Sequence, residues 1–341
     1  MITFLKKGMQ TTVQDLGRAG FQRYGMPSCG AMDTFAARLA NVLVGNAENE
    51  GVLECTVMGP TVRFETANCF AVTGGDLGAS LNGEPVPMNR ALFADAGDVL
   101  ELPMAVSGAR AYVAFAGGFD LPLVMGSYST CLKAHIGGVE GRAVKEGDTI
   151  AFRAPRTDLP NFEKRVAPEN ILPRYSAAPT VHFTFGPQDD MFSAAGKQTF
   201  IHGRYTVDAK SDRMGFRFNG PEIEAAPGSN GNIVSDGICF GAIQVPSGQP
   251  IVMMADRQTT GGYAKIGCVI AADLPLLAQL KAGDSVRFQP VSVPGAQQLL
   301  VRQSKALEKL AKALDSVRPE ARQFRFTVNG KTFTVTMTEK E

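Results

Sequence analysis

AGDSVRF (residues 282–288) places a Gly-Asp pair directly before an alternating apolar run, and the same motif recurs as AGDVLEL (96–102) and EGDTIAF (146–152). Glycine supplies the positive φ of a tight turn and aspartate hydrogen-bonds the turn backbone, after which apolar side chains alternate toward one face. The copies predict turns that open β-strands and favour two related barrel halves. The 37 glycines and 20 prolines, spread among runs of Val, Ile, Phe and Thr, are typical of a mainly β protein.

Three segments break the β pattern and predict short helices. Residues 33–45 have Asp33 as a capping residue and an apolar face that ends at a glycine. Residues 273–280 have Asp273 as a candidate cap and a proline in the first turn, where its missing N–H is tolerated. Residues 296–317 carry aligned leucines and stop before a proline.

A proline-rich stretch divides the chain. Residues 154–179 hold five prolines among charges and show little periodicity, which indicates a connection between two halves. The end of the chain, RQFRFTVNGKTFTVTM (322–337), predicts a β-hairpin that turns at Asn329-Gly330. The expected organisation is an N-terminal barrel half (1–154), a connection (155–179), a C-terminal barrel half (180–292) and a tail of helix and hairpin (293–341).

Composition excludes several classes of function. The 341 residues have a net charge of +1, so no overall field recruits nucleic acid or an anionic membrane. No apolar run approaches the roughly 18 residues needed to span a bilayer, and the first residues do not form a targeting segment, so a cytoplasmic location is expected. Six scattered cysteines and three histidines contain no Cys-x-x-Cys pair, which predicts buried thiols rather than a metal site.

The stretch IQVPSGQPIVMMADRQTTGGYAKIG (243–267) is unusually rich in polar side chains beside a segment apolar enough for a buried strand. Polar groups this dense next to apolar residues cost free energy unless they face a ligand or each other. The pattern indicates a site in which neighbouring cations keep Asp256 ionised as a candidate general base. The residues that suggest this site are Asp256, Arg257, Thr260, Tyr263 and Lys265.

A second polar cluster lies in TTVQDLGRAGFQRYGMPSCGAMD (11–33), where Asp15 is the rival candidate base. A polar loop that leads into a capped helix offers backbone N–H groups and the Arg18 guanidinium to a carboxylate or phosphate. The alternative is a turn stabilised by an ion pair between Asp15 and Arg18, with Asp33 acting only as a cap.

A third cluster, SDRMGFRFNGP (211–221), contains Arg213, which could clamp an anion or pair with Asp212 or a distant carboxylate. The sequence has no Gly-x-Ser-x-Gly string, so a covalent nucleophile has no support and carboxylate base chemistry is the simplest option. It also has no Gly-x-x-x-x-Gly-Lys-Ser/Thr string, the phosphate-binding motif of P-loop enzymes. If the protein uses ATP, we therefore expect the ATP to bind at a different kind of site.

Together TTVQDLGRAGF, GAMDTFAARLANVLVGN, GGVEGRAVKEGD, SDRMGFR and ADRQTTGGYAKIG resemble the biotin-dependent carboxyltransferase, or allophanate hydrolase subunit 2, family, from about residue 3 to 290. The resemblance implies a cyclophilin-like β-barrel architecture and partnership with a smaller, KipI-like B subunit and with an A subunit. It also implies ATP-dependent opening of 5-oxoproline to glutamate, with ATP bound mainly on a partner. Transferred to this sequence, it places three clusters around one pocket for a lactam or amide.

In that interpretation the catalytic candidates are Asp256, Asp15, Lys265 and Tyr263, and the substrate-binding candidates are Arg18, Asp33, Arg213, Asp236, Gln244, Arg257 and Thr260. Two other functions occur within the family. One is a regulatory protein that antagonises a KipI-like kinase inhibitor. The other is carboxyl transfer from biotin to urea or another amide, for which the biotin must sit on a separate carrier because the tail lacks Met-Lys-Met.

Overall fold

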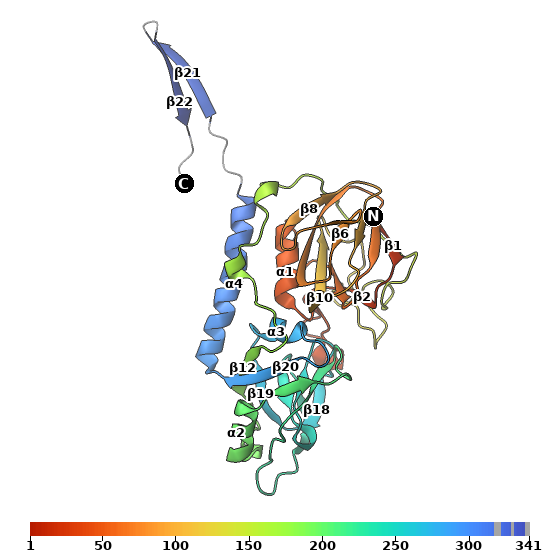
Figure 1. Cartoon of the computed structure of the whole chain (residues 1–341), viewed down its shortest axis with the longest axis vertical. Coiled ribbons are helices and arrows are strands. Elements are labelled where there is room, and N and C mark those ends of the chain that lie inside the picture. Colours follow the sequence, from red (N-terminus) through yellow and green to blue (C-terminus); the bar gives the residue numbers. More distant parts are fainter. Residues whose placement is uncertain (317–321, 329–330, 338–341) are drawn as a thin grey trace.

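The computed structural model describes residues 1–316, 322–328 and 331–337, and the chain is mainly β, as predicted. Figure 1 shows two β-rich halves, with the long helix α4 (Val293–Asp315) running alongside both. The first half has a six-stranded sheet, β11-β1-β4-β9-β6-β7, and a five-stranded sheet, β2-β3-β10-β5-β8. The second half is a closed barrel, β12-β19-β16-β17-β14-β13-β20. The barrel prediction is therefore confirmed by the second half, whereas the first divides its strands between two sheets.

The strands of the first half are β1 (Ile2–Lys6), β2 (Gln10–Gln14), β3 (Val52–Thr56), β4 (Thr61–Phe64), β5 (Asn68–Asp76), β6 (Ser80–Leu81), β7 (Glu84–Pro85), β8 (Ala91–Ala94), β9 (Val99–Glu101), β10 (Ser107–Phe115) and β11 (Thr149–Ile150). Those of the barrel are β12 (Thr180–Phe185), β13 (Tyr205–Val207), β14 (Gly215–Asn219), β16 (Ala242–Gln244), β17 (Ile251–Met253), β19 (Lys265–Val269) and β20 (Ser285–Pro290). A separate ribbon pairs β15 (Asn232–Gly237) with β18 (Thr260–Tyr263).

The Gly-Asp repeats form the same turn in all three places, before β9, β11 and β20. Their glycines have positive φ angles, 99° at Gly97, 85° at Gly147 and 90° at Gly283. In each turn the aspartate side chain accepts a hydrogen bond from the backbone N–H three residues earlier, as in Asp98 from Asp95 (2.8 Å), Asp148 from Lys145 (2.7 Å) and Asp284 from Lys281 (2.8 Å). The predicted turn chemistry is confirmed.

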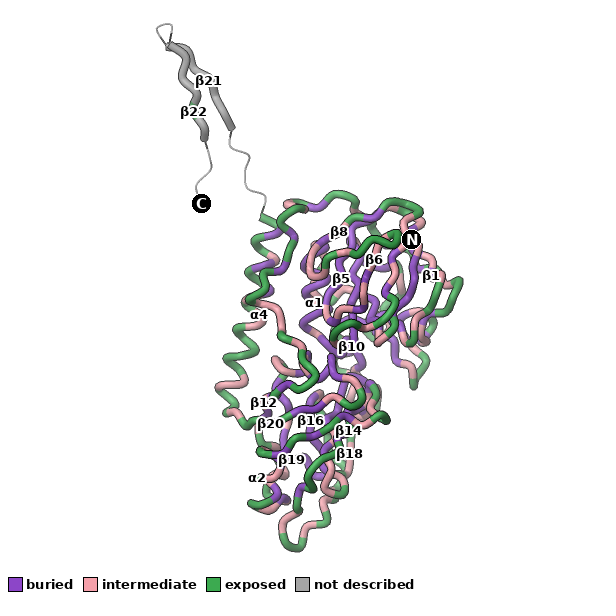
Figure 2. The backbone as a smooth tube through the Cα atoms, viewed as in Figure 1, coloured by how far each residue is buried: buried purple, intermediate pink, exposed green. Residues whose placement is uncertain are grey.

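Each half has its own aromatic core. Between the sheets, Phe64 packs against Phe70 and Phe115 with ring centroids 5.4 and 5.7 Å apart. Inside the barrel, Phe200 stacks on Phe288 at 4.7 Å. Figure 2 shows buried residues following the inner strands of both halves, while α4 keeps an exposed outer face.

The three predicted helices are present, with one error in capping. Helix α1 (Thr34–Leu43) is capped by Asp33, whose Oδ1 accepts from the Ala36 N–H at 2.9 Å. Helix α3 (Leu274–Ala278) has no side-chain cap, so the prediction for Asp273 is wrong. Its carboxylate instead accepts from the backbone N–H of His182 at 2.7 Å, because β12 lies against this end of the helix.

Two further differences concern helices. Helix α4 begins at Val293, before the predicted start, because Ser292 caps it by accepting from the Gly295 N–H. Helix α2 (Ala194–His202) was not predicted, since its sequence lacks an apolar stripe and buries little besides Phe200. The 3₁₀ turns are η1 (Gln22–Tyr24), η2 (Phe162–Lys164), η3 (Glu169–Ile171), η4 (Asp189–Met191) and η5 (Pro246–Gly248).

At the end of the chain, β21 (Arg322–Val328) pairs antiparallel with β22 (Lys331–Met337), which confirms the predicted hairpin. The predicted turn at Asn329-Gly330 lies outside the described residues. Among the helices in the described ranges, none has the length and apolar character required to cross a membrane.

Gln279, buried at the end of α3, joins the two halves. Its Oε1 accepts from the backbone N–H groups of Ala109 and Arg110, both at 2.9 Å. Its Nε2 donates to Asp33 Oδ2 at 2.9 Å and to the Arg110 carbonyl at 3.0 Å. One amide side chain therefore satisfies polar groups of α1 and β10 that would otherwise be buried without partners.

Replacing Gln279 by alanine is expected to destabilise the chain by about 1–3 kcal/mol, since buried donors lose their acceptor. The free energy of unfolding in urea measures the effect. Gln303→Ala is the matched control, because Gln303 makes a single 3.4 Å hydrogen bond to the Ala272 carbonyl on the partly exposed side of α4. Equal unfolding midpoints for the two variants would contradict a special role for Gln279.

Candidate functional site

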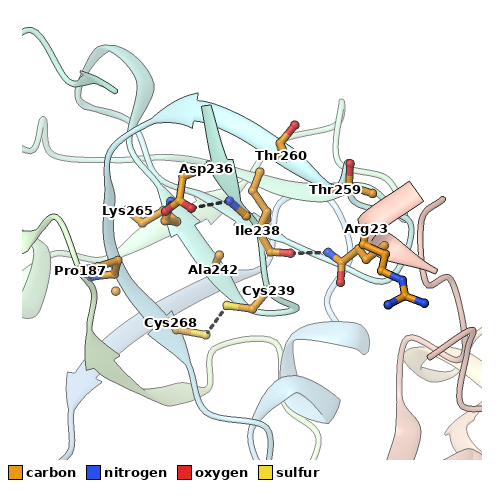
Figure 3. Close-up of a pocket in the computed structure, with 13 residues that line it drawn as sticks. Arg23, Pro187, Asp236, Ile238, Cys239, Ala242, Thr259, Thr260, Lys265 and Cys268 are labelled. Carbon is orange, nitrogen blue, oxygen red and sulfur yellow. Dashed lines mark hydrogen bonds and ion pairs between the residues drawn. The ribbon is translucent and has the colours of Figure 1, made fainter. Parts of the chain in front are cut away.

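A pocket of about 510 Å³ opens where barrel strands meet the N-terminal segment around Gln22. Asp236 of β15, Thr260 of β18 and Lys265 of β19 line it, together with Arg23 from η1. In Figure 3 the Lys265 and Asp236 side chains point toward each other on one side of the pocket and the Thr260 side chain lies on another. Three of the predicted site residues are therefore brought together.

Strand pairing explains this convergence. In the β15–β18 ribbon, Asp236 pairs with Gly261 and Gly237 with Thr260. In the barrel, Gln244 of β16 pairs with Lys265 of β19. The glycines keep the ribbon thin, and a Cβ atom at Gly261 would lie 2.5 Å from the Ile238 side chain. Residues far apart in the sequence thus meet through antiparallel neighbours.

Lys265 and Asp236 form the charged pair of the pocket. Lys265 Nζ lies 3.0 Å from Asp236 Oδ2, with 6% of the lysine side chain exposed but 56% of the aspartate. The hydrogen bond from Lys265, helped by the Gly237 N–H, lowers the pKa of the Asp236 carboxyl. Asp236 therefore stays ionised at neutral pH. A general base works best with a pKa near the working pH, so Asp236 is better suited to accept hydrogen bonds from N–H groups than to act as a base.

Arg257 and Gln244 support the pocket from behind rather than lining it. The Ile238 carbonyl accepts from Arg257 Nε at 3.1 Å and from Gln22 Nε2 at 2.8 Å. Gln244 Nε2 donates to the Tyr263 carbonyl at 3.3 Å. The Tyr263 side chain is 45% exposed and does not line the pocket, so its predicted catalytic role has no geometric support.

Arg213 and Asp256 form a buried ion pair within the barrel half, where it meets the first half, and neither residue lines the pocket. Arg213 Nε and Nη2 donate to the two Asp256 carboxylate oxygens at 3.0 and 2.9 Å. The same guanidinium donates to Glu54 of β3 and to the Gly30 carbonyl. Both Asp256 oxygens thus face Arg213, and Asp256 does not line the pocket. The alternative that Arg213 pairs with a distant carboxylate is the one observed.

Asp15 and Arg18 are buried within the N-terminal half. The Asp15 carboxylate accepts from the Gly17 and Tyr128 N–H groups at 2.8 and 2.7 Å and from two serine hydroxyls. Arg18 donates to the carbonyls of Val124 and Ser129. Both side chains are thus held inside the N-terminal half, with Arg18 Nη1 buried without a hydrogen-bond partner among the described residues, and neither residue lines the pocket. In the alternative interpretation Asp15 and Arg18 would form an ion pair with each other, but both residues make the contacts above instead.

Asp33 is wholly buried and has a structural role. Besides capping α1, its Oδ2 accepts from the Tyr175 hydroxyl at 2.7 Å and from Gln279. Burial raises the pKa of the Asp33 carboxyl against the opposing effect of these hydrogen bonds. The interpretation of Asp33 as a cap therefore fits the structure, and the proposed substrate contact does not.

Several residues that line the pocket were not among the predicted site residues. Gln22 and Arg23 belong to the polar N-terminal string, but no local pattern favoured them over Asp15 and Arg18. Cys239 and Cys268 were expected to be buried thiols, yet they line the pocket. Across the described residues, no group of three or more His, Cys, Asp and Glu side chains is placed to hold a metal ion.

Known proteins similar in sequence to this chain show the family to which it belongs. A family model for the carboxyltransferase domain, subdomains A and B, matches residues 24–290. The chain is 40% identical over 314 residues to the C subunit of 5-oxoprolinase from Escherichia coli, covering 91% of this chain and 98% of that protein. It is 37% identical over 316 residues to its counterpart from Haemophilus influenzae, covering 92% and 99%.

Among solved structures, the Kluyveromyces lactis urea carboxylase superposes with a TM-score of 0.86 at 30% sequence identity. The match covers 99% of this chain and 32% of the urea carboxylase chain. This chain therefore corresponds to about a third of that larger protein, whereas it spans nearly the full length of the bacterial relatives.

Proposed function

Since the chain belongs to the carboxyltransferase domain A and B family, we propose that it is the C subunit of an ATP-dependent 5-oxoprolinase, which opens 5-oxo-L-proline to L-glutamate together with partner subunits. The observation that carries this proposal is the 40% identity to the E. coli protein over 98% of its length. A match that extends from end to end favours the same role more strongly than a match to a fragment of a larger enzyme.

The pocket has groups suited to a small lactam with a carboxylate. The Lys265 ammonium can stabilise negative charge that develops on the lactam oxygen, and the ionised Asp236 can accept a hydrogen bond from the lactam N–H. Thr260 supplies a hydroxyl that can donate or accept. We assign Lys265 as the catalytic residue of this chain and Asp236 and Thr260 as substrate-binding residues. We assign structural roles to Asp256 and Asp15, because neither lines the pocket and both accept hydrogen bonds from groups inside the protein.

The proposal requires partners for the ATP step. The bacterial relatives are named as subunits, which implies a larger assembly. The sequence lacks the phosphate-binding string of P-loop enzymes, so we place ATP mainly on a partner. Phosphorylation of the lactam oxygen would make the ring carbon more open to water, and the charged pocket would hold the polar product.

Reconstitution with the A and B subunits is expected to release glutamate and ADP from 5-oxoproline and ATP, and omission of this chain is expected to abolish glutamate release. Coupled assays of both products measure the reaction. A stable complex that never produces glutamate would instead support the regulatory, KipI-antagonising function.

A second candidate is biotin-dependent carboxyl transfer, favoured by the close superposition on urea carboxylase. In that case activity on urea or another amide would depend on a biotinylated carrier and would be lost on addition of avidin. The 5-oxoprolinase proposal predicts that avidin leaves glutamate release unchanged, so the same reconstituted complex separates the two functions.

A further inference from the structure

Two cysteines lie side by side in the wall of the pocket. Cys239 stands in the turn between β15 and β16, and Cys268 lies on β19, with their Sγ atoms 3.4 Å apart (Figure 3). The turn is held against β19 because Ala242 pairs with Cys268 and the Val269 N–H donates to the Gly241 carbonyl at 2.8 Å. The proximity of the two sulfur atoms is thus fixed by backbone hydrogen bonds on both sides.

The surroundings favour a reactive thiolate at Cys239. A hydrogen bond from the Cys268 thiol lowers the pKa of Cys239 to about 6, and the cationic Arg257 and Lys265 act in the same direction. Cys239 is exposed, so a small oxidant can reach it through the pocket. Low pKa, neighbouring cations and access are the features that distinguish reactive cysteines from inert buried ones.

We propose that Cys239 and Cys268 are a redox-active dithiol that closes to an intramolecular disulfide when the chain meets a hydroperoxide. The Cys239 thiolate attacks the O–O bond of hydrogen peroxide, which leaves a sulfenic acid and, with the proton released from the thiol, one water. The Cys268 sulfur then attacks the Cys239 sulfur, the S–O bond breaks, and a second water leaves with the Cys268 proton. Two thiols and one peroxide become one disulfide and two waters.

Little movement is needed for this step, because the sulfur atoms must approach from 3.4 Å to about 2 Å. The disulfide would tie the turn after Asp236 to the strand that carries Lys265. Oxidation would therefore fix the relative positions of the two charged residues of the pocket. A dithiol at this place makes the pocket wall sensitive to the redox state of its surroundings.

The chain contains its own comparison pair. Cys29 and Cys131 also share a hydrogen bond between thiols, but they are 5% and 2% exposed and lie beside the buried Asp256 and Arg213. A small oxidant therefore has far less access to this second pair than to Cys239. The Cys29 hydrogen bond lowers the pKa of Cys131 to about 6 as well, so exposure is what favours oxidation of the Cys239 and Cys268 pair.

The test uses the reduced full-length chain treated with one equivalent of hydrogen peroxide, followed by alkylation and peptide mass mapping. The expected result is a cross-link between the peptides of Cys239 and Cys268, reversed by dithiothreitol, with Cys29 and Cys131 alkylated as before. In Cys268→Ser the oxidation is expected to stop at a sulfenic acid on Cys239, which dimedone traps. Cys29→Ser should retain the Cys239–Cys268 cross-link.

Free thiols at both Cys239 and Cys268 after treatment, or a cross-link between Cys29 and Cys131 in their place, would overturn the proposal. Because the wild-type chain alone gives the main readout, a variant that fails to fold does not change this outcome. The readout is also independent of glutamate release, so the dithiol and the proposed 5-oxoprolinase role can fail separately.

Discussion

Replacing Arg213 by methionine is expected to lower the free energy of unfolding by about 3–5 kcal/mol, the usual cost of removing one partner of a buried ion pair. Arg213 faces Asp256 on its own half and Glu54 on the other, and the three side chains are 5%, 11% and 1% exposed. Burial opposes the charge of the guanidinium, but the attraction of both carboxylates outweighs it and raises the pKa of Arg213. Without the arginine, two carboxylates would remain in the buried interface without their cation.

Urea unfolding of the full chain measures this effect, and Arg63→Met provides the control. Arg63 pairs with Glu65 at 2.7 Å on the surface, where losing an ion pair costs about 0–1 kcal/mol. Adding Asp256→Asn to Arg213→Met should recover part of the loss, since a neutral amide is less costly to bury than an unpaired carboxylate. An Arg213→Met chain with the midpoint of Arg63→Met would show that the ion pair does not hold the halves together.

The sequence was informative about the fold wherever local chemistry is sufficient. The Gly-Asp repeats predict their turns because the φ angle of glycine and the side-chain hydrogen bond of aspartate depend on neighbouring residues alone. Asp33 caps α1 for the same reason. Asp273 fails because a tertiary partner, the His182 N–H, competes for its carboxylate. Helix α2 was missed since packing against β20, rather than an apolar stripe, holds it in place.

The site was harder to predict, because polar density marks two different situations. Asp236, Thr260 and Lys265 line a pocket, whereas Asp15 and Asp256 accept hydrogen bonds inside the protein, mostly from residues distant in sequence. A one-dimensional pattern cannot show which carboxylate has found donors more than a hundred residues away, such as Ser127 and Ser129 for Asp15. Of the motifs that carry the family resemblance, ADRQTTGGYAKIG contains the pocket residues Thr260 and Lys265, whereas Asp236 lies outside all of them.

Replacing Lys265 by methionine is expected to lower the turnover of the reconstituted 5-oxoprolinase complex by roughly 10²-fold, the loss typical of removing one group that stabilises a developing oxyanion. The unfolding midpoint should change little. In contrast to the carboxylates around Arg213, the partner Asp236 has 56% of its side chain exposed, so water can solvate it when the lysine is gone. Loss of activity without loss of stability would distinguish a catalytic role from a structural one.

Two further variants serve as a control and as a test of substrate binding. Lys312→Met removes a lysine from an exposed ion pair with Glu308 on α4 and should leave turnover unchanged. Asp236→Asn keeps the size of the side chain but removes its charge, so a binding role predicts a raised KM for 5-oxoproline with a smaller effect on kcat. Co-purification with the A and B subunits establishes that each variant enters the complex. Wild-type turnover in an assembled Lys265→Met complex would place the chemistry elsewhere, because no other lysine lines this pocket in the described part of the chain.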